Sequence, residues 1–97
     1  MKVEFLEEAH TELEDAIEYY NGQLTGLGNA FLQEVLAVID RIAKYPEAWH
    51  PLSANTRRCQ TRRFPYGLIY SLEGDVILVV SVSNLHRKPN HWASRIK

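Results

Sequence analysis

The spacing of the hydrophobic residues changes in the middle of the chain, and this change limits the folds that are available. In the first half, hydrophobic residues recur every three or four positions, which places them along one side of a helix. Two such stripes comprise Leu6, Ala9, Leu13, Ala16, Ile17 and Tyr20, then Leu27, Phe31, Val35, Val38, Ile39 and Ile42. In contrast, residues 76–82 are almost continuously apolar and mostly β-branched, as in a strand that is buried on both faces. The chain therefore combines helices with a sheet.

Turn-forming residues set the expected boundaries of the two helices. Asn21-Gly22 tolerates left-handed backbone angles and is expected to end the first helix. Thr25 is expected to cap the second helix, and Pro46 to end it. The connector between the two helices is only about four residues long, so the helices should form an antiparallel hairpin.

The remaining segments have the composition of strands. They are residues 3–6, 57–64, 66–72 and 76–82, with Pro65 breaking the ladder and Glu73-Gly74-Asp75 forming a hairpin loop. The tail from Asn84 is expected to be irregular, with one helical turn near Trp92. We therefore predict a single α+β domain over residues 1–97, in the order β-α-α-β-β-β. A small, mainly antiparallel sheet should carry the helical hairpin on one face.

The net charge of −1 conceals an uneven distribution of charge. Residues 1–40 carry nine acidic residues and one basic residue, whereas residues 41–97 carry ten basic and three acidic residues. The single cysteine, Cys59, excludes an internal disulfide. The longest apolar run is too short to span a membrane, and the charged start argues against a signal peptide. These features predict a cytoplasmic protein whose two halves differ in charge.

Six bases would gather on one side of the sheet if the strands pair as predicted: Arg57, Arg58, Arg62, Arg63, Arg87 and Lys88. Guanidinium groups bind phosphate and carboxylate groups in a bidentate manner, so such a patch is suited to recognising either. The alternative is a solvated edge strand whose charges prevent aggregation.

The acids and histidines allow several interpretations. The acidic run of the first helix is interpreted as a solvated face, with paired catalytic carboxylates and neutralisation of the basic sheet as alternatives. His86 and His91 could act as a general acid or base beside a phosphate, or be ordinary surface residues. The spacing of the histidines and the single cysteine indicate no metal site, and no cofactor is expected.

Motifs along nearly the whole chain resemble the RelE/ParE toxin superfamily. They are Tyr19-Tyr20-Asn21, Gly26-Leu27-Gly28 with Phe31 and Glu34, Pro46, Arg57-Arg58, the run at 63–70, Glu73-Gly74-Asp75 and the run at 86–92. The chain is most similar to the ParE-like, plasmid-stabilisation branch. The superfamily fold is a small sheet carrying a helical hairpin.

The resemblance implies a bacterial type II toxin that a cognate antitoxin neutralises. ParE-like members inhibit DNA gyrase by binding it, whereas RelE-like members cut messenger RNA on the ribosome. Two arginines of the RNA-cutting branch fall here on Gly67 and near Leu85, and its functional tyrosine falls on His91. The Ala-His that is frequent in the ParE branch appears as Ser83-Asn84. These departures favour target binding over catalysis.

Our hypothesis from the sequence is therefore a gyrase-binding toxin rather than an enzyme. Arg58, Arg62, Arg63 and Arg87 would contact the target or the antitoxin. The antitoxin would present an amphipathic helix and an acidic segment. The alternatives are an mRNA endonuclease that uses Arg62, Arg87 and His91 and acts on the ribosome, and a non-toxic protein-binding module of the same fold.

Overall fold

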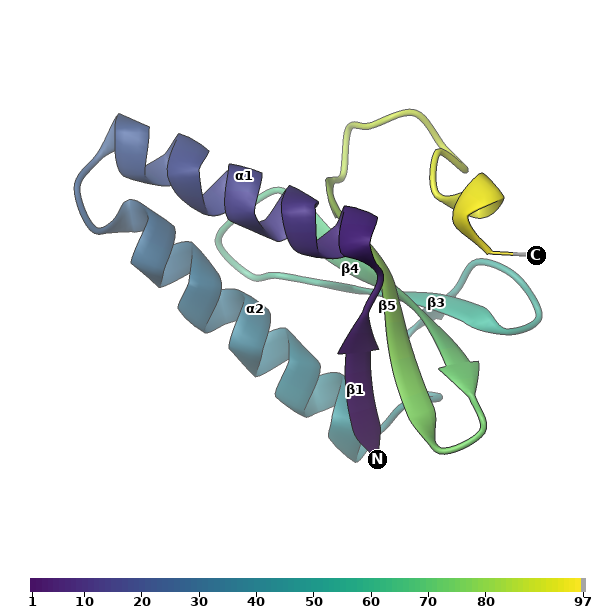
Figure 1. The fold of residues 1–97 in the computed structure, drawn as a ribbon. Coiled ribbons are helices and arrows are strands. Elements are labelled where there is room, and N and C mark those ends of the chain that lie inside the picture. The colour runs from purple at the N-terminus through teal and green to yellow at the C-terminus, as the bar shows by residue number, and fades with distance from the viewer. Residues whose placement is uncertain (97) are drawn as a thin grey trace.

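A helical hairpin packs on a mixed five-stranded sheet in the computed structural model, which describes residues 1–96 (Figure 1). The sheet order is β1-β5-β4-β3-β2. The elements are β1 (Lys2–Phe5), α1 (Glu7–Gln23), α2 (Leu27–Lys44), β2 (His50–Pro51), β3 (Thr56–Gln60), β4 (Tyr66–Glu73), β5 (Val76–Asn84) and a short 3-10 helix, η1 (Ala93–Arg95). The predicted fold class and element order are confirmed, and the two-residue strand β2 is an addition.

The apolar strand predicted at residues 76–82 is an interior strand. β5 pairs with β4 in an antiparallel manner and with β1 in a parallel manner. Val79, Val80 and Ser81 are fully buried. The register shifts between Ile69 and Tyr70, because Ile69 pairs with Ser81 whereas Tyr70 pairs with Val79. Val80 is therefore an extra residue on β5, and beyond it Val82, not Ser81, returns to the main core that Ile77 and Val79 join.

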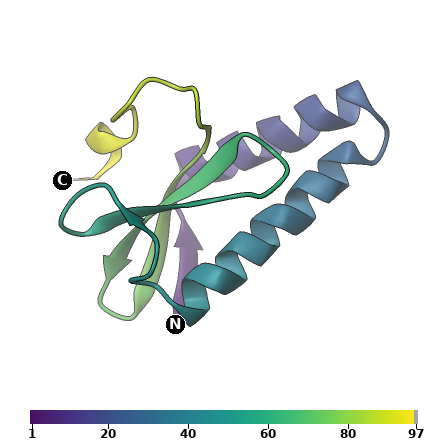
Figure 2. The same ribbon diagram turned by 180° about the vertical axis from the view of Figure 1, so that it is seen from behind.

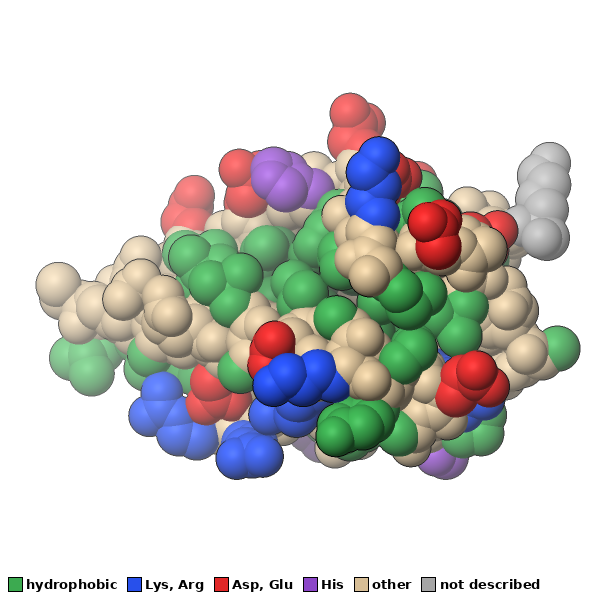
Figure 3. Space-filling model, turned by 90° about the horizontal axis from the view of Figure 1, so that it is seen from below, with side chains coloured by type: hydrophobic (Ala, Val, Ile, Leu, Met, Phe, Trp, Pro, Cys, Tyr) green, Lys and Arg blue, Asp and Glu red, His purple; other side chains and the backbone are tan. Residues whose placement is uncertain are grey.

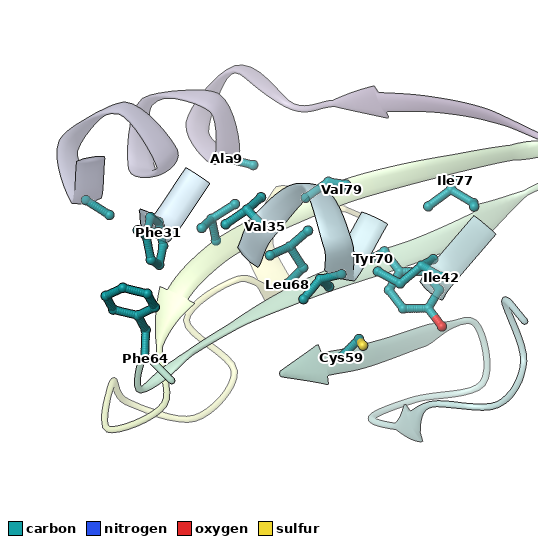
Figure 4. Packing of buried hydrophobic residues seen from close by; sticks show 13 residues of the cluster. Ala9, Phe31, Val35, Ile42, Cys59, Phe64, Leu68, Tyr70, Ile77 and Val79 are labelled. Carbon is teal, nitrogen blue, oxygen red and sulfur yellow. The ribbon is translucent and has the colours of Figure 1, made fainter. Parts of the chain in front are cut away.

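The main core lies between the helical hairpin and the sheet (Figure 4). α2 contributes Phe31, Val35, Val38 and Ile42, and α1 contributes Ala9 and Ala16, all of which are buried. The strands contribute Cys59, Leu68, Tyr70, Ile77, Val79 and Val82. Burial raises the pKa of Tyr70 to about 12, and its hydroxyl donates a hydrogen bond to the Pro46 carbonyl. The predicted packing of both helices on one face of the sheet is thereby confirmed.

The connection between the helices differs from the prediction. α1 continues through Asn21-Gly22 to Gln23, and the left-handed residue is Gly26, with φ of 88°. Thr25 does not act as the cap; Gly26 occupies the N-cap position. Instead, Asn21 Oδ1 accepts a hydrogen bond of 2.8 Å from the backbone N–H of Gly28, so α1 supplies the cap of α2. A Cβ at Gly28 would lie 2.4 Å from the Ile17 carbonyl oxygen, which explains the glycine there.

Gly28→Ala is expected to lower the free energy of unfolding by about 2–3 kcal/mol, because the contacting atom belongs to the backbone and cannot rotate away. Gly22→Ala is the matched control. A Cβ there meets nothing within 4 Å inside α1, so this change should stabilise the protein by about 0.5–1 kcal/mol. Urea unfolding of both variants measures the difference. Equal effects of the two substitutions would contradict the proposed close approach.

β3 is shorter than predicted, since it ends at Gln60 rather than at residue 64. The Thr61 hydroxyl donates to the Phe64 carbonyl at 2.7 Å, and the Thr61 N–H donates to the Tyr66 carbonyl at 3.0 Å. These bonds close a turn between Thr61 and Tyr66 that contains Pro65. As a result, Arg62 and Arg63 lie on a loop and not on the strand.

The C-terminal segment covers part of the other face of the sheet (Figure 2). Trp92 is 7% exposed and packs in a cluster with Ile69 and Val80, flanked by Leu52 and Ile96. The helical turn expected near Trp92 is present as η1. Among residues 1–96, neither helix has the length and apolar character that crossing a membrane requires.

Candidate functional site

The carboxylate of Glu12 is the centre of a polar cluster where α1, β5 and the C-terminal segment meet. Its side chain is 15% exposed. Arg95 donates to both oxygens, from Nη1 at 2.8 Å and from Nη2 at 3.0 Å. Arg87 Nη1 donates at 2.7 Å, and the Val82 N–H at 3.1 Å. We refer to Glu12, Ser81, Val82, Arg87 and Arg95 as the Glu12 cluster.

The position of the Glu12 cluster follows from the difference in length between β1 and β5. β1 pairs with β5 only as far as Val79, so the rest of this β5 edge lacks a partner strand. Glu12 accepts a hydrogen bond from the Val82 N–H, and Arg95 Nη1 donates to the Val80 carbonyl at 3.0 Å. Two side chains thus take the place of the missing strand, because buried backbone polar groups need partners.

The bonds to Glu12 stabilise its charged form. Burial by itself would raise the pKa of the Glu12 carboxyl, but the hydrogen bonds from Arg95 and the Val82 N–H outweigh burial and lower it. The hydrogen bond to Glu12 correspondingly raises the pKa of the Arg95 guanidinium. Both groups therefore remain ionised and tie the C-terminal segment to α1.

A second acidic residue organises the loop after β3. Glu34 Oε1 accepts from the backbone N–H groups of Arg62 and Arg63, at 2.8 and 3.0 Å. Its Oε2 accepts from Arg63 Nε at 2.7 Å. Burial opposes ionisation of Glu34, but the bonds from Arg63 and Arg62 outweigh it and lower the pKa of this carboxyl. The sequence raised neutralisation of the basic sheet by the acids of the first helix as an alternative. Of those acids, Glu12 pairs with Arg87 and Arg95, which lie beyond β5, and Glu34 of α2 pairs with Arg63.

Acid should weaken the fold through these two carboxyl groups. Because their pKa values are lowered in the folded protein, their contribution is fully present above the ordinary value of 4.5. That contribution is lost as the pH falls through the lower folded-state values. Urea midpoints measured from neutral to acid pH should therefore decline below about pH 4.5. Glu12→Gln should flatten this decline, and an unchanged profile would contradict the assignment.

The six bases predicted to form one patch lie in three places. Arg57 Nη1 donates to the Trp49 carbonyl at 2.9 Å, and Arg62 and Arg63 lie beside Glu34 of α2. The other three, Arg58, Arg87 and Lys88, line a cavity of about 150 Å³ beneath the C-terminal segment. We call it the C-terminal cavity. The six bases therefore do not lie on one side of the sheet as predicted, because β3 ends before Arg62 and because Arg57 and Arg58 point to opposite faces. Arg58 nevertheless also lines a second cavity, beside β3, together with Arg62.

His91 lies on the wall of the C-terminal cavity and contacts the Glu12 cluster. Its Nδ1 donates to the Lys88 carbonyl at 3.0 Å, since a carbonyl oxygen can only accept. Its Nε2 lies 3.1 Å from Ser81 Oγ, which in turn lies 3.2 Å from Glu12 Oε1. His91 is thus held by both ring nitrogens. Arg62, which the nuclease hypothesis would pair with it, instead lines two other cavities beside β3 and α2.

The cavity beside α2 gives Arg62 and Arg63 a different setting. It has a volume of about 420 Å³ and is lined by Ala30, Ala37, Gln33, Glu34, Arg41, Arg62 and Arg63. Small apolar side chains of α2 thus lie next to three arginines. Figure 3 shows one face of the molecule, with Lys and Arg side chains beside acidic ones next to a band of hydrophobic side chains.

Sequence reasoning missed Glu12, Ser81 and Arg95 as members of the site. One signal was present: Glu12 follows Ala9 by three positions and precedes Ala16 by four, so it borders the apolar stripe of α1. Acids at such a border are often partly buried and need a basic partner. Nothing in the local pattern identifies Arg95 as that partner, because the two residues are 83 positions apart.

The chain is similar to one toxin family in sequence and to a solved structure in fold. A family model described as the ParE toxin of the type II toxin-antitoxin system, parDE, matches residues 3–89. A solved structure described as the chromosomal ParDE TA system from P. aeruginosa is similar, with a TM-score of 0.75 and 11% identity. That match covers 87% of this chain and 95% of the other chain. No curated protein matches the chain in sequence. Because the identity is only 11%, this structural similarity is evidence for the fold alone.

Proposed function

The chain belongs to the ParE toxin family of type II toxin-antitoxin systems, and we propose from this that it inhibits DNA gyrase by binding it in the cytoplasm. We further propose that a cognate antitoxin neutralises it. As a member of this family, the protein is the toxin component of such a system. The proposal therefore concerns its target, its mode of action and its partner.

The placement of Arg62 carries the preference for binding over RNA cleavage. A nuclease site would need Arg62, Arg87 and His91 around one phosphate. Arg87 and His91 line the C-terminal cavity, whereas Arg62 lies on the loop held by Glu34. In addition, Arg87 already forms an ion pair with Glu12 at 2.7 Å. This arrangement supports a surface that contacts a protein at several separate points.

The cavity beside α2 is the surface we assign to the antitoxin. Its small apolar residues could receive the apolar side of an amphipathic helix, and Arg41, Arg62 and Arg63 would attract acidic residues along that helix. Leu36 of α2 is also 48% exposed. An acidic, amphipathic helical segment fits both features.

Expression in a bacterium tests this proposal. Induction should stop growth, reduce the negative supercoiling of a resident plasmid and leave transcripts intact. Co-expression of the antitoxin should restore growth. Transcript cleavage with normal plasmid supercoiling would instead support the endonuclease alternative, and normal growth would support a non-toxic module.

A further inference from the structure

We propose that the C-terminal cavity binds the side-chain carboxylate of an acidic residue from a protein partner. The inference rests on the proposed function only in assigning the carboxylate to a partner protein. Compared with the contacts expected from the sequence, the proposal adds Lys88 as a contact residue. It also places the contact on the face of the sheet opposite the helices. This site is separate from the surface beside α2 that we assign to the antitoxin helix.

The charges around the cavity are all of one sign. Its lining includes Arg58, Arg87 and Lys88 but no acidic residue. Arg87 shares the charge of Glu12 with Arg95. Within residues 1–96, neither Arg58 nor Lys88 forms an ion pair. The cavity therefore carries an excess of positive charge that an anion would neutralise.

The aliphatic part of the Arg58 side chain lies over Gly67 of β4. A Cβ at Gly67 would lie 3.2 Å from Arg58 Cγ and 3.3 Å from Leu85 Cδ2, so the glycine leaves room for both side chains. The Nε atom of Arg58 is shielded from solvent, and no described residue accepts a hydrogen bond from it. Since an unpaired buried donor is costly, an acceptor bound beside Arg58 would remove that cost.

The walls and the size of the cavity favour a carboxylate side chain over a nucleic-acid backbone. Leu52, Ile69, Leu85, Pro89 and Trp92 provide apolar contacts for methylene groups. The volume of about 150 Å³ is several times the roughly 30 Å³ of one water molecule, which suits one side chain. The net charge of −1 also gives little long-range attraction to a polyanion.

Nuclear magnetic resonance titration of the full chain tests the assignment. The probe is the capped dipeptide acetyl-Leu-Glu-amide, with acetyl-Leu-Gln-amide as its uncharged match. We expect saturable shifts of the Arg58 Nε–H signal and of the Leu85 and Lys88 amides with the glutamate peptide. The glutamine peptide should bind about tenfold more weakly or not at all.

Two variants that each remove one lysine charge test where the peptide binds. Lys88→Gln should weaken the glutamate peptide about tenfold, whereas Lys2→Gln on β1 should leave its affinity unchanged. Lys88 lies on a loop outside the core, so its substitution should leave the protein folded. An unchanged spectrum of the free Lys88→Gln variant would verify this, and a loss of peptide binding would then not be due to unfolding. Equal shifts with both peptides, or tighter binding of a short oligouridine than of the glutamate peptide, would overturn the inference. Because gyrase takes no part in this titration, its result is independent of the proposed target.

Discussion

Glu12→Ala is expected to lower the free energy of unfolding by about 3 kcal/mol, one of the two largest effects we predict. The substitution removes the acceptor for two arginines and for the Val82 N–H. Arg95, whose side chain is 13% exposed, would keep a charge without its partner. For a domain of this size, the loss corresponds to a melting temperature lower by about 12–24 °C.

Urea and thermal unfolding measure this effect, and two variants separate its causes. Glu12→Gln keeps an oxygen for the Val82 N–H but removes the charge, so it should cost less than Glu12→Ala. Glu14→Ala, on the exposed side of α1, removes only a surface contact with His10 and should change stability by less than about 1 kcal/mol. If Glu12→Ala behaved like Glu14→Ala, the Glu12 cluster would not hold the C-terminal segment.

Trp92→Ala should destabilise the protein by about 3–5 kcal/mol, because a nearly buried indole is removed from its cluster with Ile69 and Val80. The side chain is also a wall of the C-terminal cavity, so the glutamate peptide should no longer bind. Loss of stability and loss of binding are thus expected together in this variant.

Trp92→Phe is the control for the tryptophan prediction. It preserves most of the apolar contact and should cost less than about 1.5 kcal/mol. Unfolding midpoints and the peptide titration are measured on both variants. A Trp92→Ala protein as stable as the original would show that the C-terminal segment does not depend on this contact.

The fold could be predicted because its signals are local or repeat along the chain. The stripe from Phe31 to Ile42 faces the sheet as its spacing indicates, and residues 76–82 form an interior strand. The predicted helix end at Asn21-Gly22 was wrong for a non-local reason. The Asn21 amide caps α2, so it favours the hairpin without ending α1.

The candidate site was less predictable, because it depends on which residues meet across the fold. The sequence pattern treated Arg62, Arg63 and Arg87 as parts of one surface. The structure separates them, since Glu34 binds the loop after β3 while Glu12 binds Arg87. Their roles in recognition remain predictions that the proposed experiments test.

The unequal charges of the two halves have a structural role as well as a functional one. Glu12 and Glu34 come from the acidic half and bind Arg63, Arg87 and Arg95 from the basic half. These pairs join the helical hairpin to the loops and tail of the sheet. Arg58 and Lys88, which are among the bases that form no ion pair within residues 1–96, are the ones we assign to a partner's carboxylate.

A supercoiling assay with the purified protein tests the proposed function most directly. Gyrase, ATP and relaxed plasmid are incubated with increasing amounts of the toxin, with and without its antitoxin. We expect a dose-dependent loss of supercoiled product that the antitoxin reverses. Full supercoiling in the presence of excess toxin, together with cleavage of mRNA on ribosomes by the same preparation, would contradict it.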